Sequence, residues 1–175
     1  NIIFLVCIST MMLPFQVQMI PLYVTFRSLG WMNTYKPLVV PAFFGSAYYI
    51  FLLRQFFLTI PQELSDAARV DGCSELMIYG RIVLPLAKPA LAVVGLYQFM
   101  AAWNDYLGPL IYLAEERLYP ISLGLQQLRM ASWRETQVWP WLMAATTSVI
   151  APVIIIFYLA QRTFVEGITL TGIKG

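Results

Sequence analysis

Few residues of this chain could perform chemistry, and their types exclude most enzyme classes. The 175 residues include no histidine, and the two cysteines, Cys7 and Cys73, stand apart without a metal-ligand spacing. Neither a Ser/His/Asp nor a Cys/His arrangement can be built without histidine, and no GxxxxGK[ST] phosphate loop is present. We therefore predict that the chain is not an enzyme and has no metal, disulfide framework or cofactor of its own.

Polar residues that could serve a function gather at two places. The stretch DAARVDGCSELMIYGRIVLP, residues 66–85, carries charges of both signs between long apolar runs. The other place is Asp105, beside Trp103, Asn104 and Tyr106, in an otherwise apolar run. An acid inside a membrane span is costly enough to be a functional candidate. The alternative is structural, with Asp105 making a hydrogen bond between helices or near a proline.

The composition shows what kind of elements must position these residues. Hydrophobic residues make up 59% of the chain and charged residues 11%, far from the roughly 25% charged residues of soluble domains. This predicts a membrane protein. A net charge of +2 with scattered basic residues gives no nucleic-acid footprint. The chain opens at Asn1 inside an apolar run without a basic leader, so we expect a fragment lacking its N-terminal part rather than a signal peptide.

Four apolar runs are long enough to cross a bilayer as helices. About 20 apolar residues span the hydrocarbon core, and the runs cover about 1–26, 37–58, 88–114 and 137–161. We expect an all-α protein, with kinks where prolines such as Pro14 and Pro152 fall within the runs. The alternating loops carry six basic residues on one side and five on the other. The small excess lies on the side of the loop at residues 60–85 and the tail, which weakly favours a cytoplasmic location for both.

The segment at residues 60–85, here called the polar island, has the local signals of two helices joined by a turn. Pro61 suits the first turn of a helix, and no helix breaker follows until Gly72, which favours the left-handed conformation that ends a helix. Ser74 is a plausible N-cap for the second helix, which we expect to run to Leu84 before Pro85 closes it. Such an island could dock a partner, or it could rest on the lipid headgroups as an interfacial connector.

The same residues resemble a known family. The spacing D-A-A, three residues, Gly72, nine residues, then I-V-L-P resembles the EAA motif of ABC-transporter permease subunits from binding-protein-dependent importers. Asp66 stands where the family usually has glutamate, which puts the strength of a salt bridge to the ATPase in doubt. Further stretches are similar to the carbohydrate branch, to which maltose-transporter permeases belong: LLRQFF, IP, KPAL, WNDYLGPLIYL and the C-terminal TGIKG.

The resemblance implies the transmembrane domain of a type I ABC importer, with four of an expected six transmembrane helices in this chain. The polar island would be a cytoplasmic coupling helix that transmits closure of the ATPase. The residues implied in ATPase coupling are Glu63, Asp66, Ala67, Ala68, Asp71, Gly72, Ile82, Leu84 and Pro85. The tail residues Thr171, Gly172, Lys174 and Gly175 would also reach the ATPase; their alternative is a disordered terminus.

The partners follow from the same resemblance. They are a second permease subunit, a dimer of ATP-binding subunits that binds ATP and Mg²⁺, and an extracytoplasmic binding protein facing the loop at 115–138, all at a bacterial cytoplasmic membrane. The candidate substrate path is Trp103, Asn104, Asp105 and Tyr106, whose rings could stack on a sugar. Three alternatives stay open: an ABC permease for another small solute, an ion-coupled transporter using Asp105, and a structural subunit without transport.

Overall fold

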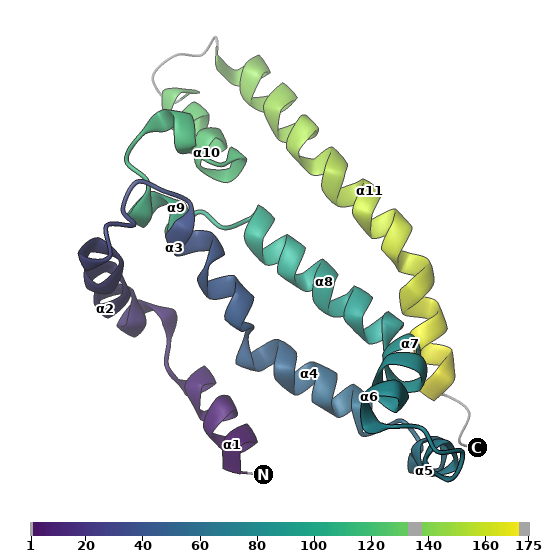
Figure 1. The fold of residues 1–175 in the computed structure, drawn as a ribbon. Helices are drawn as coiled ribbons and strands as arrows, with labels where there is room; N and C mark the ends of the chain where they lie inside the picture. The colour runs from purple at the N-terminus through teal and green to yellow at the C-terminus, as the bar shows by residue number, and fades with distance from the viewer. Residues whose placement is uncertain (1, 133–137, 172–175) are drawn as a thin grey trace. The chain divides into compact units, whose positions relative to one another are not determined.

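The structure is a computed structural model that describes residues 2–132 and 138–171, and every regular element in that part of the chain is a helix. The all-α prediction is therefore confirmed. Figure 1 colours the chain from α1 in purple to α11 in yellow. The α-helices are α1 (Ile2–Ser9), α2 (Phe15–Ser28), α3 (Lys36–Val39), α4 (Ala47–Phe57), α5 (Gln62–Val70), α6 (Glu75–Ile78), α7 (Leu84–Leu86), α8 (Lys88–Trp103), α9 (Leu107–Tyr112), α10 (Ile121–Ser132) and α11 (Trp139–Thr171). The shorter elements in the described part of the chain are the 3-10 helices η1 (Thr10–Met12), η2 (Pro41–Phe44) and η4 (Glu116–Leu118) and the π-helix η3 (Tyr79–Val83).

The chain divides into two compact units. The first takes residues 1–47 and 99–155, and the second takes residues 48–98 and 156–175. The polar island belongs wholly to the second unit, and the polar residues around Asp105 belong to the first. Each candidate site therefore lies within a single unit.

Among the described residues, two stretches of helix are long and apolar enough to cross a membrane, Lys36–Phe57 with 22 residues and Trp139–Gln161 with 23. Two bent pairs, Ile2–Met12 with Phe15–Ser28 and Glu75–Leu86 with Lys88–Trp103, raise the number to four if each pair counts as one span. Apolar side chains on α11 such as Ile154 and Phe157 are well exposed, as expected of a surface that faces lipid.

The first predicted span is not one straight helix. α1 and α2 meet at a bend of 97°, because Pro14 disfavours helical geometry at Leu13, which is extended with φ −85° and ψ 109°. The carbonyl of Leu13 accepts a hydrogen bond from Nε2 of Gln18 at 2.8 Å. The bend therefore leaves this backbone oxygen paired, as an apolar environment requires.

Two of the other three predicted spans are also interrupted. Gly45, with φ 77°, interrupts the second between η2 and α4. The third ends as a helix at Trp103 and resumes as the short α9 from Leu107. The last is continuous as far as residue 161 and contains Pro152 inside α11.

Pro85 does not close the second helix of the polar island, so that prediction is wrong. Pro85 lies inside α7, directly after the π-helix η3. In a regular α-helix its ring would clash with the carbonyl of Arg81, four residues earlier, and the wider π turn gives that carbonyl room. The helical path ends instead at Ala87, where a bend of 69° leads into α8.

Candidate functional site

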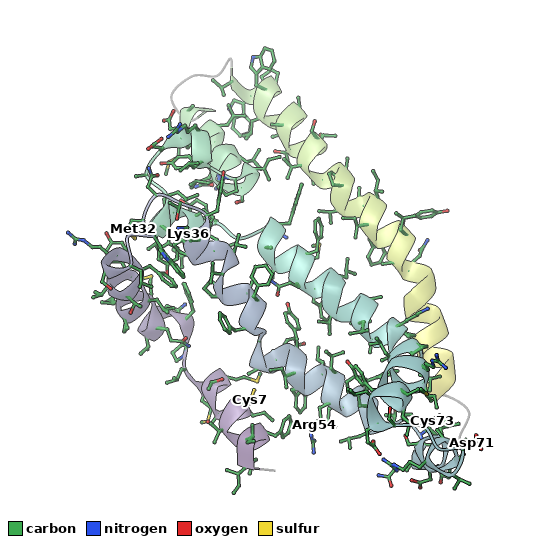
Figure 2. All side chains as sticks on the ribbon, viewed as in Figure 1. Cys7, Met32, Lys36, Arg54, Asp71 and Cys73 are labelled. Carbon is green, nitrogen blue, oxygen red and sulfur yellow. The ribbon has the colours of Figure 1, made fainter. Side chains whose placement is uncertain are left out.

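The turn of the polar island is a Schellman motif. α5 ends at Val70, and Gly72 adopts the left-handed conformation with φ 79°. The Cys73 amide donates to the Ala68 carbonyl at 2.9 Å, and the Gly72 amide donates to the Arg69 carbonyl at 3.0 Å. These bonds pair carbonyl oxygens that the helix end would leave free. The predicted left-handed position at Gly72 is confirmed, and Figure 2 labels Asp71 and Cys73 on either side of it.

The second helix of the island begins as the sequence predicts. Oγ of Ser74 accepts a hydrogen bond from the Met77 amide at 3.4 Å, which makes Ser74 the N-cap of α6. Glu75 occupies the first turn of α6, where the helix dipole favours a negative charge. Figure 1 shows α5, α6 and α7 gathered together in the second unit.

The predicted coupling residues differ in how accessible they are. Exposed residues of the set are Glu63, Asp66, Ala67, Asp71, Gly72 and Pro85, and half-buried ones are Ile82 and Leu84. Ala68 is buried, with 6% of its surface exposed. Only one of the two alanines, Ala67, therefore presents the open surface that close approach of another backbone would need.

Sequence reasoning missed two exposed apolar side chains of the island. Val70 is 89% exposed and Leu76 is 84% exposed, although one precedes the Gly72 turn and the other follows it. The island carries charges of both signs, and yet both of these apolar side chains are exposed. Both side chains were visible in the sequence, but only the turn geometry shows that neither faces inward.

Arg69 connects the two helices of the island. Its Nη1 donates to Oδ1 of Asp66 at 2.6 Å, its Nε donates to Oε1 of Glu75 at 2.7 Å, and its Nη2 reaches Oε2 of Glu75 at 3.3 Å. The hydrogen bonds from Arg69 lower the pKa of the Glu75 carboxyl, and the Glu75 carboxylate raises the pKa of Arg69. Arg69 was not among the residues singled out from the sequence.

The second candidate site is the helix break at residues 104–106. The Asn104 side chain donates to the Met100 carbonyl at 2.8 Å. Oδ1 of Asp105 accepts from the Gly108 amide at 3.1 Å, and the carbonyl of Asp105 accepts from Oγ of Ser122 at 2.6 Å. The Asp105 carboxylate therefore stabilises the start of α9 through a local hydrogen bond, rather than through the bond between helices or to a carbonyl near Pro109 that its structural interpretation predicts.

The aromatic neighbours of Asp105 are engaged to different degrees. The Trp103 ring stacks on Phe99, with centroids 5.3 Å apart, and its Nε1 is buried without a hydrogen-bond partner among the described residues. Tyr106 is half-buried. A stacking role of Trp103 on a sugar would require its ring to leave Phe99 or to use its other face.

Asp105 also lines a pocket within the first unit. The pocket measures about 350 Å³, and its other lining residues are Phe15, Leu22, Phe26, Pro37, Leu38, Pro41, Leu107, Gly108 and Tyr112. Gly108 is packed tightly against this acid, because a Cβ added there would lie 2.6 Å from Oδ2 of Asp105. One carboxylate among apolar walls can orient a ligand but offers little polar recognition of its own.

A cluster that the sequence did not suggest joins two distant loops of the first unit. Oδ1 of Asn33 accepts from the amides of Ala114 and Glu115 at 3.1 Å each, and its Nδ2 donates to Oε1 of Glu115 at 2.6 Å. The Asn33 amide also donates to the Tyr112 carbonyl at 2.8 Å. We call Asn33 with Tyr112, Ala114 and Glu115 the loop clasp; Figure 2 labels Met32 and Lys36 beside Asn33 in the chain.

A second Schellman motif supports the loop clasp from the end of α2. The Trp31 amide donates to the Phe26 carbonyl at 2.9 Å across Gly30, whose φ is 67°. The rings of Phe26 and Trp31 stack at 5.6 Å, and Phe26 also meets Tyr112 edge-on at 5.4 Å. Gly30 after an apolar helix is a signal that could have revealed this turn from the sequence.

Part of the predicted tail contact has no structural counterpart here. Thr171 is the last residue of α11, whereas Gly172, Lys174 and Gly175 lie outside the described residues. Among residues 2–132 and 138–171, no group of three His, Cys, Asp or Glu side chains could hold a metal ion. The absence of a metal or cofactor stays a prediction.

Comparison with known proteins identifies the class. The family described as "Binding-protein-dependent transport system inner membrane component" matches residues 1–169, and the chain belongs to this family. The arabinooligosaccharide permease AraQ of Halalkalibacterium halodurans is 35% identical over the whole chain and 61% of its own length. The sn-glycerol-3-phosphate permease UgpE of Salmonella typhi is 36% identical over 96% of the chain and 59% of its own length.

A solved structure agrees with these relatives. A chain in the crystal structure of a bacterial ABC transporter involved in import of the acidic polysaccharide alginate has a TM-score of 0.79 and 27% identity, over 94% of this chain and 61% of that one. The chain thus spans about three fifths of the length of the proteins it matches. The predicted resemblance to ABC-transporter permeases is confirmed.

Proposed function

We propose that this chain is the core of a permease subunit in an ATP-driven, binding-protein-dependent importer of sugars or oligosaccharides. The observation that carries the proposal is the geometry of the polar island in a chain of this family: two short helices fixed by a Schellman turn and an N-cap. A rigid contact of this kind outside the lipid is what a subunit without a phosphate loop of its own needs in order to receive work from an ATPase.

The partners and the orientation are part of the proposal. ATP and Mg²⁺ bind to two partner ATPase subunits, a second permease completes the path, and a binding protein delivers the solute from outside. The polar island and the tail face the cytoplasm of a bacterial cell. The loop clasp supports this arrangement, because it joins the loops around residues 33 and 115, which four alternating spans place on the same side.

The class of solute is the most specific part of this proposal. Relatives named for arabinooligosaccharides and alginate support a sugar. The relative named for sn-glycerol-3-phosphate is equally similar to this chain, and it favours a second candidate, a phosphorylated polyol. Neither the pocket beside Asp105 nor its one carboxylate decides between the two.

Reconstitution tests the proposal. The full-length permease would be placed in proteoliposomes with its partner permease, ATPase and binding protein, and ATP hydrolysis and solute uptake would be measured with a panel of oligosaccharides and glycerol phosphates. We expect one solute to stimulate both. An assembly with a hydrolysis-deficient ATPase is the control. Uptake that follows an ion gradient without ATP would overturn the proposal and favour an ion-coupled transporter that uses Asp105.

A further inference from the structure

Arg69 uses every nitrogen of its guanidinium group to join the two helices of the polar island. One nitrogen contacts Asp66 on its own helix α5, and the other two grip both oxygens of Glu75 on α6. A planar guanidinium that binds a carboxylate through two hydrogen bonds fixes direction as well as distance. We call these three residues the Arg69 brace.

The brace is not needed to form the turn. The turn is already closed by the bonds from Gly72 and Cys73 to α5, and α6 is already capped by Ser74. The side chains of the brace are also largely exposed, at 49% for Arg69, 66% for Asp66 and 71% for Glu75. Exposed ion pairs add little to stability, so the consequence of the brace is the orientation of α6 relative to α5.

Asp66 also takes part in the brace. The sequence pattern placed this acid as a partner for basic residues of the ATPase. In the structure its Oδ1 accepts from Arg69, three residues away on the same helix. The Asp66 carboxylate therefore orients Arg69, and Arg69 binds Glu75 on the other side of the Gly72 turn.

We propose that Arg69 is a positioning residue that fixes the angle between α5 and α6, so that the polar island transmits displacement as one rigid body. The inference rests on the proposed function for the displacement but on the described contacts alone for the rigidity. Loss of the brace then leaves both helices intact, while the angle between α5 and α6 varies more widely. ATP hydrolysis continues in that case, and less solute is moved for each ATP.

The test measures rigidity and coupling separately. Spin labels would be placed on cysteines substituted at Gln62 of α5 and Leu76 of α6, with the native Cys7 and Cys73 changed to serine, in the full-length permease in nanodiscs. We expect the distance distribution to broaden in Arg69→Met and to be partly restored in Arg69→Lys. An unchanged distribution in Arg69→Met overturns the proposal, and because this measurement needs no transport, it does so independently of the proposed function.

The coupling measurement uses the reconstituted importer and the ratio of solute moved to ATP hydrolysed. Arg69→Met is expected to lower the ratio by about twofold to fivefold, the effect of losing an exposed ion pair. The double variant with Glu75→Gln should be no worse than the poorer single variant, because both remove the same contact. Arg81→Met, which removes an exposed arginine of η3, is the matched control. Effects of the two single changes that multiply, or an equal loss in Arg81→Met, overturn the positioning role.

Discussion

Gly72 controls the turn of the polar island through its backbone alone. A Cβ at this position would meet nothing within 4 Å, so a substitution there costs only the strain of φ 79°. That strain is about 1–2 kcal/mol for a residue with a side chain and is greatest for a β-branched one. The whole effect of a substitution is therefore exerted on the direction in which the chain leaves α5.

We expect Gly72→Val to uncouple ATP hydrolysis from uptake while the permease still inserts into the membrane. Gly72→Asn should retain most coupling, since asparagine tolerates the left-handed region. Gly80→Ala is the control, because Gly80 also has open space around its Cα and lacks a positive φ. The reconstituted importer gives the ratio of uptake to hydrolysis, and a wild-type ratio in Gly72→Val would contradict the role of the turn.

Substitution of Asp105 can distinguish a structural role of its side chain from a role in the solute path. Asparagine keeps an oxygen at the position that accepts from the Gly108 amide, whereas leucine does not. We expect Asp105→Asn to transport with unchanged solute dependence, and Asp105→Leu to lose about 1 kcal/mol of stability, the usual worth of a helix cap. Thermal unfolding in detergent and uptake assays measure the two effects. Uptake lost in Asp105→Asn alone would assign the charge itself to the solute path.

The loop clasp acts between elements rather than at one residue. Asn33 itself has φ 57°, an unusual value for a residue other than glycine. Asn33→Gly keeps that backbone at little cost and the hydrogen bond to the Tyr112 carbonyl, but it removes the three side-chain bonds to Ala114 and Glu115. The loops then lose their main polar link while the turn survives.

We expect Asn33→Gly to lower the free energy of unfolding by about 1.5–4.5 kcal/mol, given roughly 0.5–1.5 kcal/mol for each of the three bonds. Asn33→Ala should lose more, because it adds backbone strain. Thermal unfolding of the purified permease would measure both. Unfolding of Asn33→Gly at the wild-type temperature would show that the clasp contributes nothing.

At the level of elements, the apolar runs were predictable and their interruptions were not. Long runs without charge indicate spans wherever they occur, and Gly72 and Ser74 are local signals that need no tertiary information. The breaks at Leu13 and Asn104 depend on whether freed backbone groups find partners, and those partners are Gln18 and Ser122. A sequence does not show such pairings in advance.

The Arg69 brace and the loop clasp were missed for related reasons. Arg69 pairs with Glu75 across a turn, so the contact follows only from the direction of the turn. Asn33 pairs with Glu115, 82 residues away, and no local pattern marks either partner. Pro85 is a case in which a local signal gave a wrong prediction. Proline normally marks a helix end, but the π-helix η3 accommodates Pro85 within the helix.

For the molecule as a whole, the proposed orientation can be tested by labelling. In a background with Cys7 and Cys73 changed to serine, we expect a membrane-impermeant maleimide to label Arg117→Cys from outside intact spheroplasts and Asp71→Cys only in inside-out vesicles. Both wild-type residues are exposed in this chain, so access to the reagent depends on sidedness when the permease is expressed without its ATPase subunits. Labelling of both from the same side would contradict the four-span arrangement.

The loop clasp also sets an order of events during biosynthesis. Asn33 leaves the ribosome 82 residues before Glu115, which is roughly 4–16 seconds at a synthesis rate of about 5–20 residues per second. During that interval the nascent chain contains α2 and its following loop without the partners of Asn33. The clasp can close only after α9 and the residues that follow it have been synthesised, so the first unit is completed by residues made well after α2.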